Sequence, residues 1–111
     1  SYLYLNQLYL FKIFKNKIMI SANSYFNETV KSLGYINALG KSTVGVMEEG
    51  YYEFGTSMHE TMTVIEGELI VLLPNETEWK SYKSSETFEI EANSFFKVKS
   101  VGQTSYLCQY K

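Results

Sequence analysis

Apolar and polar residues alternate in short segments from Phe26 to the C-terminus of the 111-residue chain. A period of two places every second side chain on one face of a strand, whereas a helix repeats its apolar positions every three or four residues. No segment keeps the helical spacing over three turns. The alternation predicts strands over residues 30–36, 43–47, 51–54, 61–65, 68–73, 87–90, 95–99 and 105–110.

Residues with turn preferences separate these segments. Glu66 and Gly67 stand between two of them, where a glycine supplies the positive φ of a short hairpin connection. Pro74 ends the next strand because it lacks an amide hydrogen, and Asn75 and Glu76 form the turn. Short strands at this spacing are typical of a barrel or sandwich, so the sequence predicts a single all-β domain.

Residues 1–18 differ from the rest of the chain. Their apolar residues are interrupted by Asn6, Gln7 and Lys12, so the stretch is too short to span a bilayer. It also lacks the basic start and the small-residue cleavage site of a signal peptide. Met19 looks like a natural start. We therefore expect residues 1–18 to be an N-terminal extension, either native or foreign to the protein, that adds a strand or packing arm, and residues 19–111 to be the domain.

Composition excludes several kinds of function. The formal net charge of −2 argues against a nucleic-acid-binding protein. The chain has no Asp and no Arg, His59 is its only histidine and Cys108 its only cysteine. An intrachain disulfide, a Cys-rich zinc site, a Ser-His-Asp triad and a bidentate arginine clamp on phosphate are all impossible, although a triad with Glu is open. A lone cysteine suits a cytoplasmic protein, and we expect neither nucleic-acid nor membrane binding.

Glu60 and Gly67 have the spacing of the first cupin motif, in which an inward-pointing Glu is followed, after six residues, by a Gly. The chain therefore resembles a cupin, a double-stranded β-helix or jelly-roll barrel. Metal-binding cupins place two histidines upstream of the Glu. At the two histidine positions this chain has Glu53 and Gly55, or Phe54 and Thr56 in the shorter variant of the motif. The positions of the second cupin motif are occupied by Ser85, Glu91, Asn93 and Phe96.

A mononuclear metal site needs three or four ligands, and of the cupin ligand set only Glu60 is present. His59 precedes Glu60, so on a strand its side chain points to the opposite face, and we interpret it as a surface or loop residue. Asn93 suits the left-handed conformation that a Gly of the second motif supplies. We expect a metal-free cupin, which argues against a metal-dependent oxygenase or isomerase.

Four runs of sequence, residues 42–50, 62–67, 71–74 and 104–110, resemble the pyrimidine/purine nucleoside phosphorylases with a cupin fold. Ser24-Tyr-Phe26 and residues 30–34 are similar to the start of that family, so the likeness extends from Met19 to Tyr110. The chain departs from the family pattern at four positions, where it has His59 and Glu91 for Pro, Ser85 for Gly and Gln109 for Arg.

The resemblance implies an enzyme that cleaves purine and pyrimidine nucleosides with inorganic phosphate, giving free base and α-D-ribose 1-phosphate. It implies nucleosides and phosphate as substrates and no cofactor. The reaction needs a phosphate cradle, a carboxylate near the sugar and a donor near the base, and no covalent nucleophile. Small cupins also pair through an edge strand or a barrel face, so we expect a homodimer.

Glu60 and Tyr106 are the candidate catalytic residues. The cupin register points Glu60 into the barrel, where it either stabilises the sugar cation or is a buried structural Glu. Tyr106 shares a strand face with Cys108 and Tyr110, where it either contacts the base or fills the core. The candidate phosphate- or substrate-binding residues are Lys41, Thr63, Thr104, Ser105 and Glu49. Lys41 either attracts phosphate as a point charge or is an ordinary solvated surface lysine.

Met62 and Val64 are in phase with Glu60 and should line the barrel as an apolar wall, which suits weak selection among bases. Cys108 has no base near it in the sequence, and we interpret it as a small buried residue. The alternative function is a non-catalytic cupin that binds a nucleoside, a sugar or another small ligand, since the fold hosts both enzymes and binding proteins.

Overall fold

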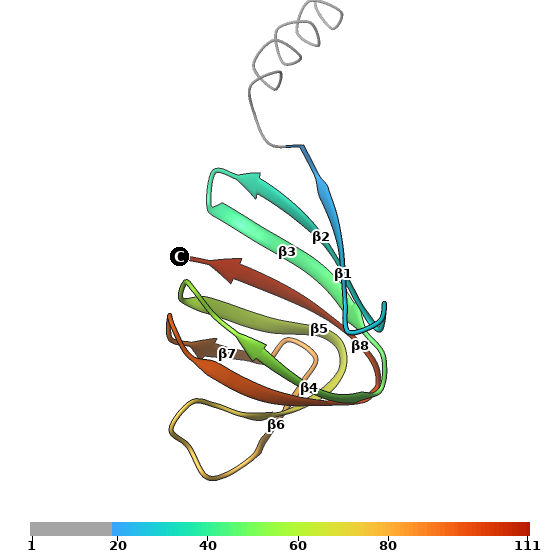
Figure 1. Cartoon of the computed structure of the whole chain (residues 1–111), viewed down its shortest axis with the longest axis vertical. Coiled ribbons are helices and arrows are strands. Elements are labelled where there is room, and N and C mark those ends of the chain that lie inside the picture. Colours follow the sequence, from blue (N-terminus) through green and yellow to red (C-terminus); the bar gives the residue numbers. More distant parts are fainter. Residues whose placement is uncertain (1–18) are drawn as a thin grey trace, which may run out of the picture.

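A computed structural model describes residues 19–111, and all structural statements below concern these residues. They form strands and no helix, and so contain no helix long and apolar enough to cross a membrane. The strands, shown in Figure 1, are β1 (Ser21–Tyr25), β2 (Val30–Asn37), β3 (Gly40–Met47), β4 (Gly50–Gly55), β5 (Glu60–Leu72), β6 (Lys80–Lys83), β7 (Thr87–Ile90) and β8 (Phe95–Tyr110).

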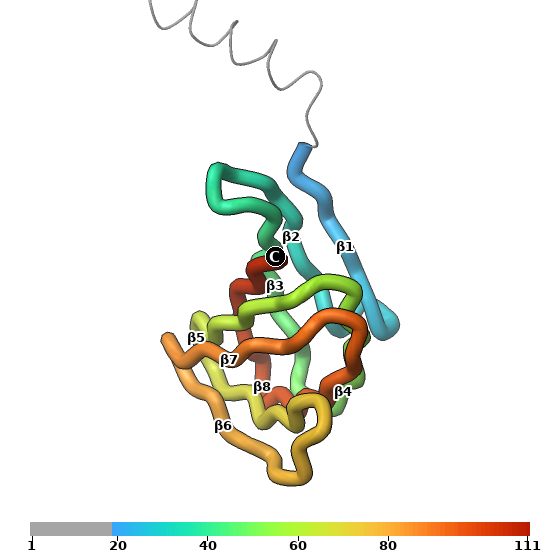
Figure 2. The backbone as a smooth tube through the Cα atoms, turned by 90° about the vertical axis from the view of Figure 1, so that its left-hand side faces the viewer, coloured from blue at the N-terminus to red at the C-terminus, as the bar shows by residue number. Residues whose placement is uncertain are grey.

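All eight strands join in one antiparallel sheet that curls into a barrel (Figures 1 and 2). The long strands β5 and β8 pair with each other over most of their length. The second half of β8 also pairs with β3, which continues to β2 and β1, and the first half of β5 pairs with β7. We call this part the first wall. The second wall consists of β4, the first half of β8, the second half of β5 and β6.

The hairpin expected at Glu66 and Gly67 is wrong. The chain does not reverse there, because β5 continues from Glu60 to Leu72 with register shifts between Val64 and Glu68. Gly67 does have a positive φ of 107°, but it uses this conformation in a bulge that bends the strand. A Cβ on Gly67 would lie 2.6 Å from the Thr104 hydroxyl, so a larger residue would clash with β8.

The other strands bear out the alternation, with two differences. The strands predicted at residues 95–99 and 105–110 are one strand, β8, just as 61–65 and 68–73 are one strand, β5. The sequence missed β1 and β6, which are edge strands with mostly polar or exposed side chains and no apolar alternation. Asn93 has the expected left-handed φ of 56°, and Ser85, at a family glycine position, has a φ of 73°.

The core lies inside the barrel, where the inward residues of both walls meet. Met62 and Val64 are buried there with the alternation expected from Glu60, and Cys108 is buried as expected. The core consists of Val30, Met47, Tyr52, Met62, Val64, Leu69, Val71, Phe88, Ile90, Phe96, Val98, Tyr106 and Cys108.

Candidate active site

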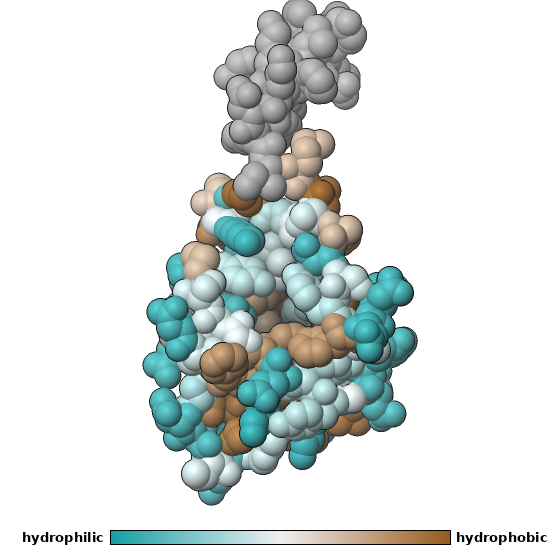
Figure 3. Space-filling model, viewed as in Figure 1, coloured by the Kyte–Doolittle hydropathy of each residue, from teal (hydrophilic) through white to brown (hydrophobic). Residues whose placement is uncertain are grey.

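A cavity of about 550 Å³ opens between the two walls, a volume typical of small-molecule sites. Figure 3 shows the molecule hollowed in the middle of one face, with apolar side chains beside the hollow. The cavity is lined by Tyr25, Phe26, Ser32, Thr43, Met47, Glu53, Phe54, Gly55, Ser57, Glu60, Met62, Phe96, Tyr106, Cys108 and Tyr110.

The first wall gives the cavity a polar side. Glu60 is the first residue of β5 and lies opposite Tyr110 on β8. The Cys108 thiol donates a hydrogen bond to Glu60 Oε1 at 3.4 Å, and the Thr43 and Tyr110 hydroxyls lie 3.3 Å apart. One carboxylate and several hydroxyl groups therefore converge where β5 begins and β8 ends.

Burial sets the protonation of this polar side. Burial raises the pKa of Glu60, while the Cys108 hydrogen bond and His59 lower it in part. Burial, with smaller contributions from Cys108, Tyr25 and Glu60, raises the pKa of Tyr106 to about 12, so this phenol keeps its proton at neutral pH. Burial and the nearby Glu60 also raise the pKa of Cys108, which makes its thiol a poor nucleophile.

The second wall gives the cavity an aromatic side. The rings of Phe54 on β4 and Phe96 on β8 stack with centroids 5.5 Å apart. Phe26, from the β1–β2 turn, packs edge-on against Phe54 at 5.4 Å. The cavity thus has a hydroxyl and carboxylate side facing an apolar aromatic side, an arrangement that fits a ligand with a polar sugar and a planar ring.

Tyr106 owes its place to a glycine on the neighbouring strand. Gly45 pairs with Tyr106 across β3 and β8. A Cβ on Gly45 would lie 2.5 Å from both Cζ and Oη of the Tyr106 ring. The phenol therefore lies directly over the Gly45 backbone, and only a residue without a side chain leaves room for it.

Three of the residues expected in the site lie at or beside the cavity. Glu60 and Tyr106 line it together, on adjacent strands. Lys41 on β3 is exposed, and strand alternation places it on the same face as Thr43. Its Nζ lies 5.3 Å from the ring centroid of Tyr110, which lines the cavity.

The other four candidates do not line the cavity. The Thr63 hydroxyl lies 3.1 Å from that of Thr87, on the strand face opposite Met62. Thr104 is fully buried and holds the β5 bulge through hydrogen bonds with the backbone of Glu68. The remaining two contact backbone groups of β5 and β8: Ser105 donates to the Glu66 carbonyl and Glu49 accepts from the Gly102 amide.

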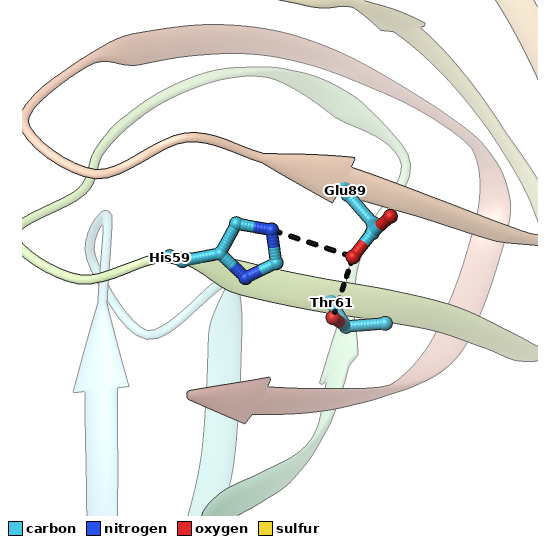
Figure 4. A network of polar contacts seen from close by, with 3 residues as sticks. All are labelled: His59, Thr61 and Glu89. Atoms are coloured by element: carbon cyan, nitrogen blue, oxygen red, sulfur yellow. Dashed lines mark hydrogen bonds and ion pairs between the residues drawn. The ribbon is translucent and has the colours of Figure 1, made fainter. Parts of the chain in front are cut away.

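Two of the departures from the family pattern lie outside the cavity. Gln109 lies on the face of β8 opposite Cys108 and Tyr110, so the residue at this position does not face the cavity. His59 Nε2 lies 3.3 Å from Glu89 Oε1, which also accepts a hydrogen bond from Thr61 at 3.4 Å. Figure 4 shows this network of His59, Thr61 and Glu89. His59 does not line the cavity, whereas its neighbour Glu60 does, as their positions in the sequence predict.

The residues at the cupin metal positions do not fit a metal ion. Glu53 and Glu60 line the cavity, but Gly55 and Phe96 offer no ligand. Within residues 19–111 no three His, Cys or Glu side chains are grouped so that they could hold a metal. Two carboxylates are fewer ligands than a stable metal site needs.

Sequence reasoning missed several cavity residues. Thr43 and Tyr110 have ordinary strand surroundings in the sequence, and only the β3–β8 pairing brings their hydroxyls together. Phe26 and Phe54 look like core residues, and nothing in the chain indicates that their rings meet beside an open cavity. The face shared by Tyr106, Cys108 and Tyr110 was a usable signal for Tyr110.

Solved structures support the fold. A protein of unknown function from Vibrio parahaemolyticus superposes with a TM-score of 0.81 at 44% identity, covering 85% of this chain and 100% of that one. A protein of unknown function from Acinetobacter superposes at 0.78 with 27% identity, covering 84% and 91%. The EutQ protein of Clostridium difficile, at 16% identity and a TM-score of 0.59, covers 71% of this chain and 59% of that one and shares the fold alone. The fold is a cupin, as expected.

Curated relatives give the family. A protein of Saccharophagus degradans named pyrimidine/purine nucleoside phosphorylase is 50% identical over 92 residues, 83% of this chain and 98% of that protein. One of the same name from Pseudoalteromonas atlantica is 48% identical, covering 83% and 99%. The family described as pyrimidine/purine nucleoside phosphorylase matches residues 20–110. With this match over nearly all of the described residues, the chain belongs to the pyrimidine/purine nucleoside phosphorylase family.

Proposed function

We propose that this protein cleaves purine and pyrimidine nucleosides with inorganic phosphate, giving free base and α-D-ribose 1-phosphate, in the cavity between the two walls. The observation that carries the proposal is the family match over residues 20–110. The cavity supports it, because its polar side suits a ribose and its aromatic side suits a base. Phosphate is a co-substrate, and the proposed reaction uses no cofactor.

The reaction breaks the bond between the anomeric carbon and the base nitrogen and forms a bond from that carbon to a phosphate oxygen. Positive charge develops on the sugar in the transition state. The Glu60 carboxylate, held by the Cys108 hydrogen bond, lies where it can stabilise that charge. The departing base gains electron density and takes up the proton that hydrogen phosphate loses when its oxygen becomes the ester oxygen of ribose 1-phosphate.

Tyr106 and Lys41 supply the other groups that the reaction needs. Because burial keeps the Tyr106 phenol protonated, it serves as a hydrogen-bond donor to the substrate. Lys41, beside Tyr110, draws phosphate to the cavity as a point charge. Thr63, Thr104, Ser105 and Glu49 have no place in this proposal, because none of them lines the cavity.

Base release from uridine, cytidine, adenosine and guanosine, with and without phosphate, tests the proposal. We expect release only with phosphate, and a loss of about 10²-fold or more in kcat for Glu60→Gln, which keeps the shape but removes the charge. Glu89→Gln is the matched control, because Glu89 is also a carboxylate near His59 but lies outside the cavity. No release from any nucleoside by the folded wild type would sink the proposal.

A non-catalytic binding protein for a nucleoside or sugar is the second candidate. One observation favours it, namely that the charged residues lining the cavity, Glu53 and Glu60, are both acidic and repel phosphate. Thermal stabilisation by nucleoside without any base release is the result that this candidate predicts.

We further propose a cytoplasmic protein that functions as a homodimer in nucleoside salvage or breakdown. The lone buried cysteine supports a reducing compartment. Among residues 19–111, β1 pairs only with β2 and forms an edge of the sheet, and edge strands are common sites of association. Cell fractionation and light scattering test these two points.

A further inference from the structure

The turn between β1 and β2 has an unusual backbone. Phe26, Asn27 and Glu28 have φ values of 51°, 55° and 66°, in the left-handed region, and none of them is glycine. Such a conformation costs a non-glycine residue about 1 kcal/mol or more, and such residues cluster where contacts with the rest of the molecule hold them. Three in succession indicate that surrounding contacts fix this turn.

Hydrogen bonds anchor the turn to β4. The amide and the hydroxyl of Thr29 both donate to the Phe26 carbonyl, at 3.2 and 2.7 Å. The Thr29 carbonyl accepts from the Glu48 amide at 2.8 Å, and the Glu48 carbonyl accepts from the Tyr52 hydroxyl at 2.7 Å. The backbone of Phe26 is therefore fixed relative to Tyr52, whose ring its own side chain contacts.

The Phe26 ring packs against two rings of β4 without being buried. Its centroid lies 5.2 Å from that of Tyr52 and 5.4 Å from that of Phe54, and both contacts are edge-on. Nevertheless 45% of Phe26 is exposed, and it lines the cavity. A ring held this firmly but left open on the cavity side offers its free surface to a ligand.

We propose that Phe26 is a substrate-contacting residue that forms, with Phe54, the subsite for the nucleoside base. This inference rests on the proposed function, in that it takes a nucleoside as the ligand. The two rings meet at 87°, so a planar base in the corner between them lies flat against one ring and edge-on to the other. Its ribose then faces the polar side, which carries Glu60.

The chemistry of the corner accounts for a broad choice of base. Phe26, Phe54 and the neighbouring Phe96 carry no hydrogen-bonding group, so they cannot select among the polar edges of different bases. Stacking on an aromatic side chain tolerates any base, because every base has a π-face. The subsite therefore accepts purines and pyrimidines alike.

Kinetics of the variant Phe26→Leu test the proposal. Leucine keeps the apolar packing on Tyr52 and Phe54 but removes the π-face, so a merely structural role would leave its kinetics unchanged. We expect KM to rise about tenfold for adenosine and for uridine, with kcat changed far less, and Phe26→Trp to keep a KM close to the wild type. Phe95→Leu, at an aromatic residue that is 69% exposed and does not line the cavity, is the matched control. A KM for Phe26→Leu equal to that of the control overturns the proposal.

A binding measurement separates this proposal from the proposed function. The chain has one tryptophan, Trp79, so Phe26→Trp combined with Trp79→Phe places the only tryptophan beside the cavity. We expect adenosine and uridine to quench its fluorescence saturably, whereas free ribose does not. Quenching without base release from the wild type would support the subsite and refute the phosphorylase. Base release without quenching would refute the subsite alone, and absence of both would refute the two proposals together.

Discussion

The contact between Gly45 and Tyr106 leads to a quantitative prediction. In Gly45→Ala the new Cβ would lie 2.5 Å from Cζ and Oη of Tyr106 and 2.8 Å from Cε1. Ordinary van der Waals contact begins near 3.4 Å, so the phenol has to move by roughly 1 Å. Tyr106 is only 7% exposed, and such overpacking of a core side chain costs about 1–3 kcal/mol. For a domain of this size, about 2 kcal/mol lowers Tm by roughly 10 °C.

Gly55→Ala is the control for this experiment. Its Cβ would also be close to a ring, 3.1 Å from Cε1 of Phe95, but that ring is largely exposed and can swing into solvent. We expect this variant to change the free energy of unfolding by less than about 0.5 kcal/mol.

Urea denaturation of a double-mutant cycle isolates the contact. Tyr106→Leu removes the ring, so adding Gly45→Ala to it should cost far less than adding Gly45→Ala to the wild type. The difference between the two costs is the coupling free energy, and we expect it to exceed 1 kcal/mol. The reasoning is wrong if the two substitutions are additive, or if Gly45→Ala costs no more than Gly55→Ala.

Three further predictions follow from burial and from the edges of the sheet. Because burial raises the pKa of Glu60, the folded state keeps the proton of this carboxyl to a higher pH than the unfolded chain does. The free energy of unfolding should therefore fall as the pH rises from the ordinary pKa of 4.5 through the raised pKa. Urea denaturation of Glu60→Gln across this pH range should lack that part of the pH dependence. Cys108 is buried with a raised pKa, so a thiol reagent at pH 8 should modify it slowly in the native protein and at once in urea, and equal rates would contradict its placement. Light scattering should give twice the mass of one chain, and a clean monomer would exclude the homodimer.

The sequence predicted the fold class because two signals agreed. Period-two alternation placed most of the strands, and the spacing from Glu60 to Gly67 identified the barrel. The hairpin prediction failed at that same Gly67, because a positive φ serves a hairpin turn and a β-bulge equally well. Whether the chain reverses or only bends there depends on β8, whose Thr104 binds the bulge across a large separation in the sequence.

The candidate site was predicted less completely. The cupin register pointed Glu60 into the barrel, and strand alternation put Tyr106 on one face with Cys108 and Tyr110. Strand alternation does not tell which buried hydroxyl is open to a cavity. Thr104, for example, is fully buried, and its hydroxyl binds the backbone of Glu68 instead of lining the cavity. The aromatic side of the cavity could not be predicted from the sequence, because Phe26 and Phe54 meet only where the β1–β2 turn folds onto β4.

The continuity of β5 and β8 through both walls limits how the cavity can exchange its contents. Both strands run from one wall into the other, with Glu60 and Tyr110 paired in the first wall and Leu72 and Lys97 paired in the second. To swing apart, the two walls would have to open the bends of both strands at the β5 bulge, where the Thr104 hydroxyl holds the backbone of Glu68. The structure therefore disfavours a clamshell motion, in which two rigid lobes swing apart about a hinge of a few loop residues, and side chains at the rim of the cavity set the size limit for a ligand.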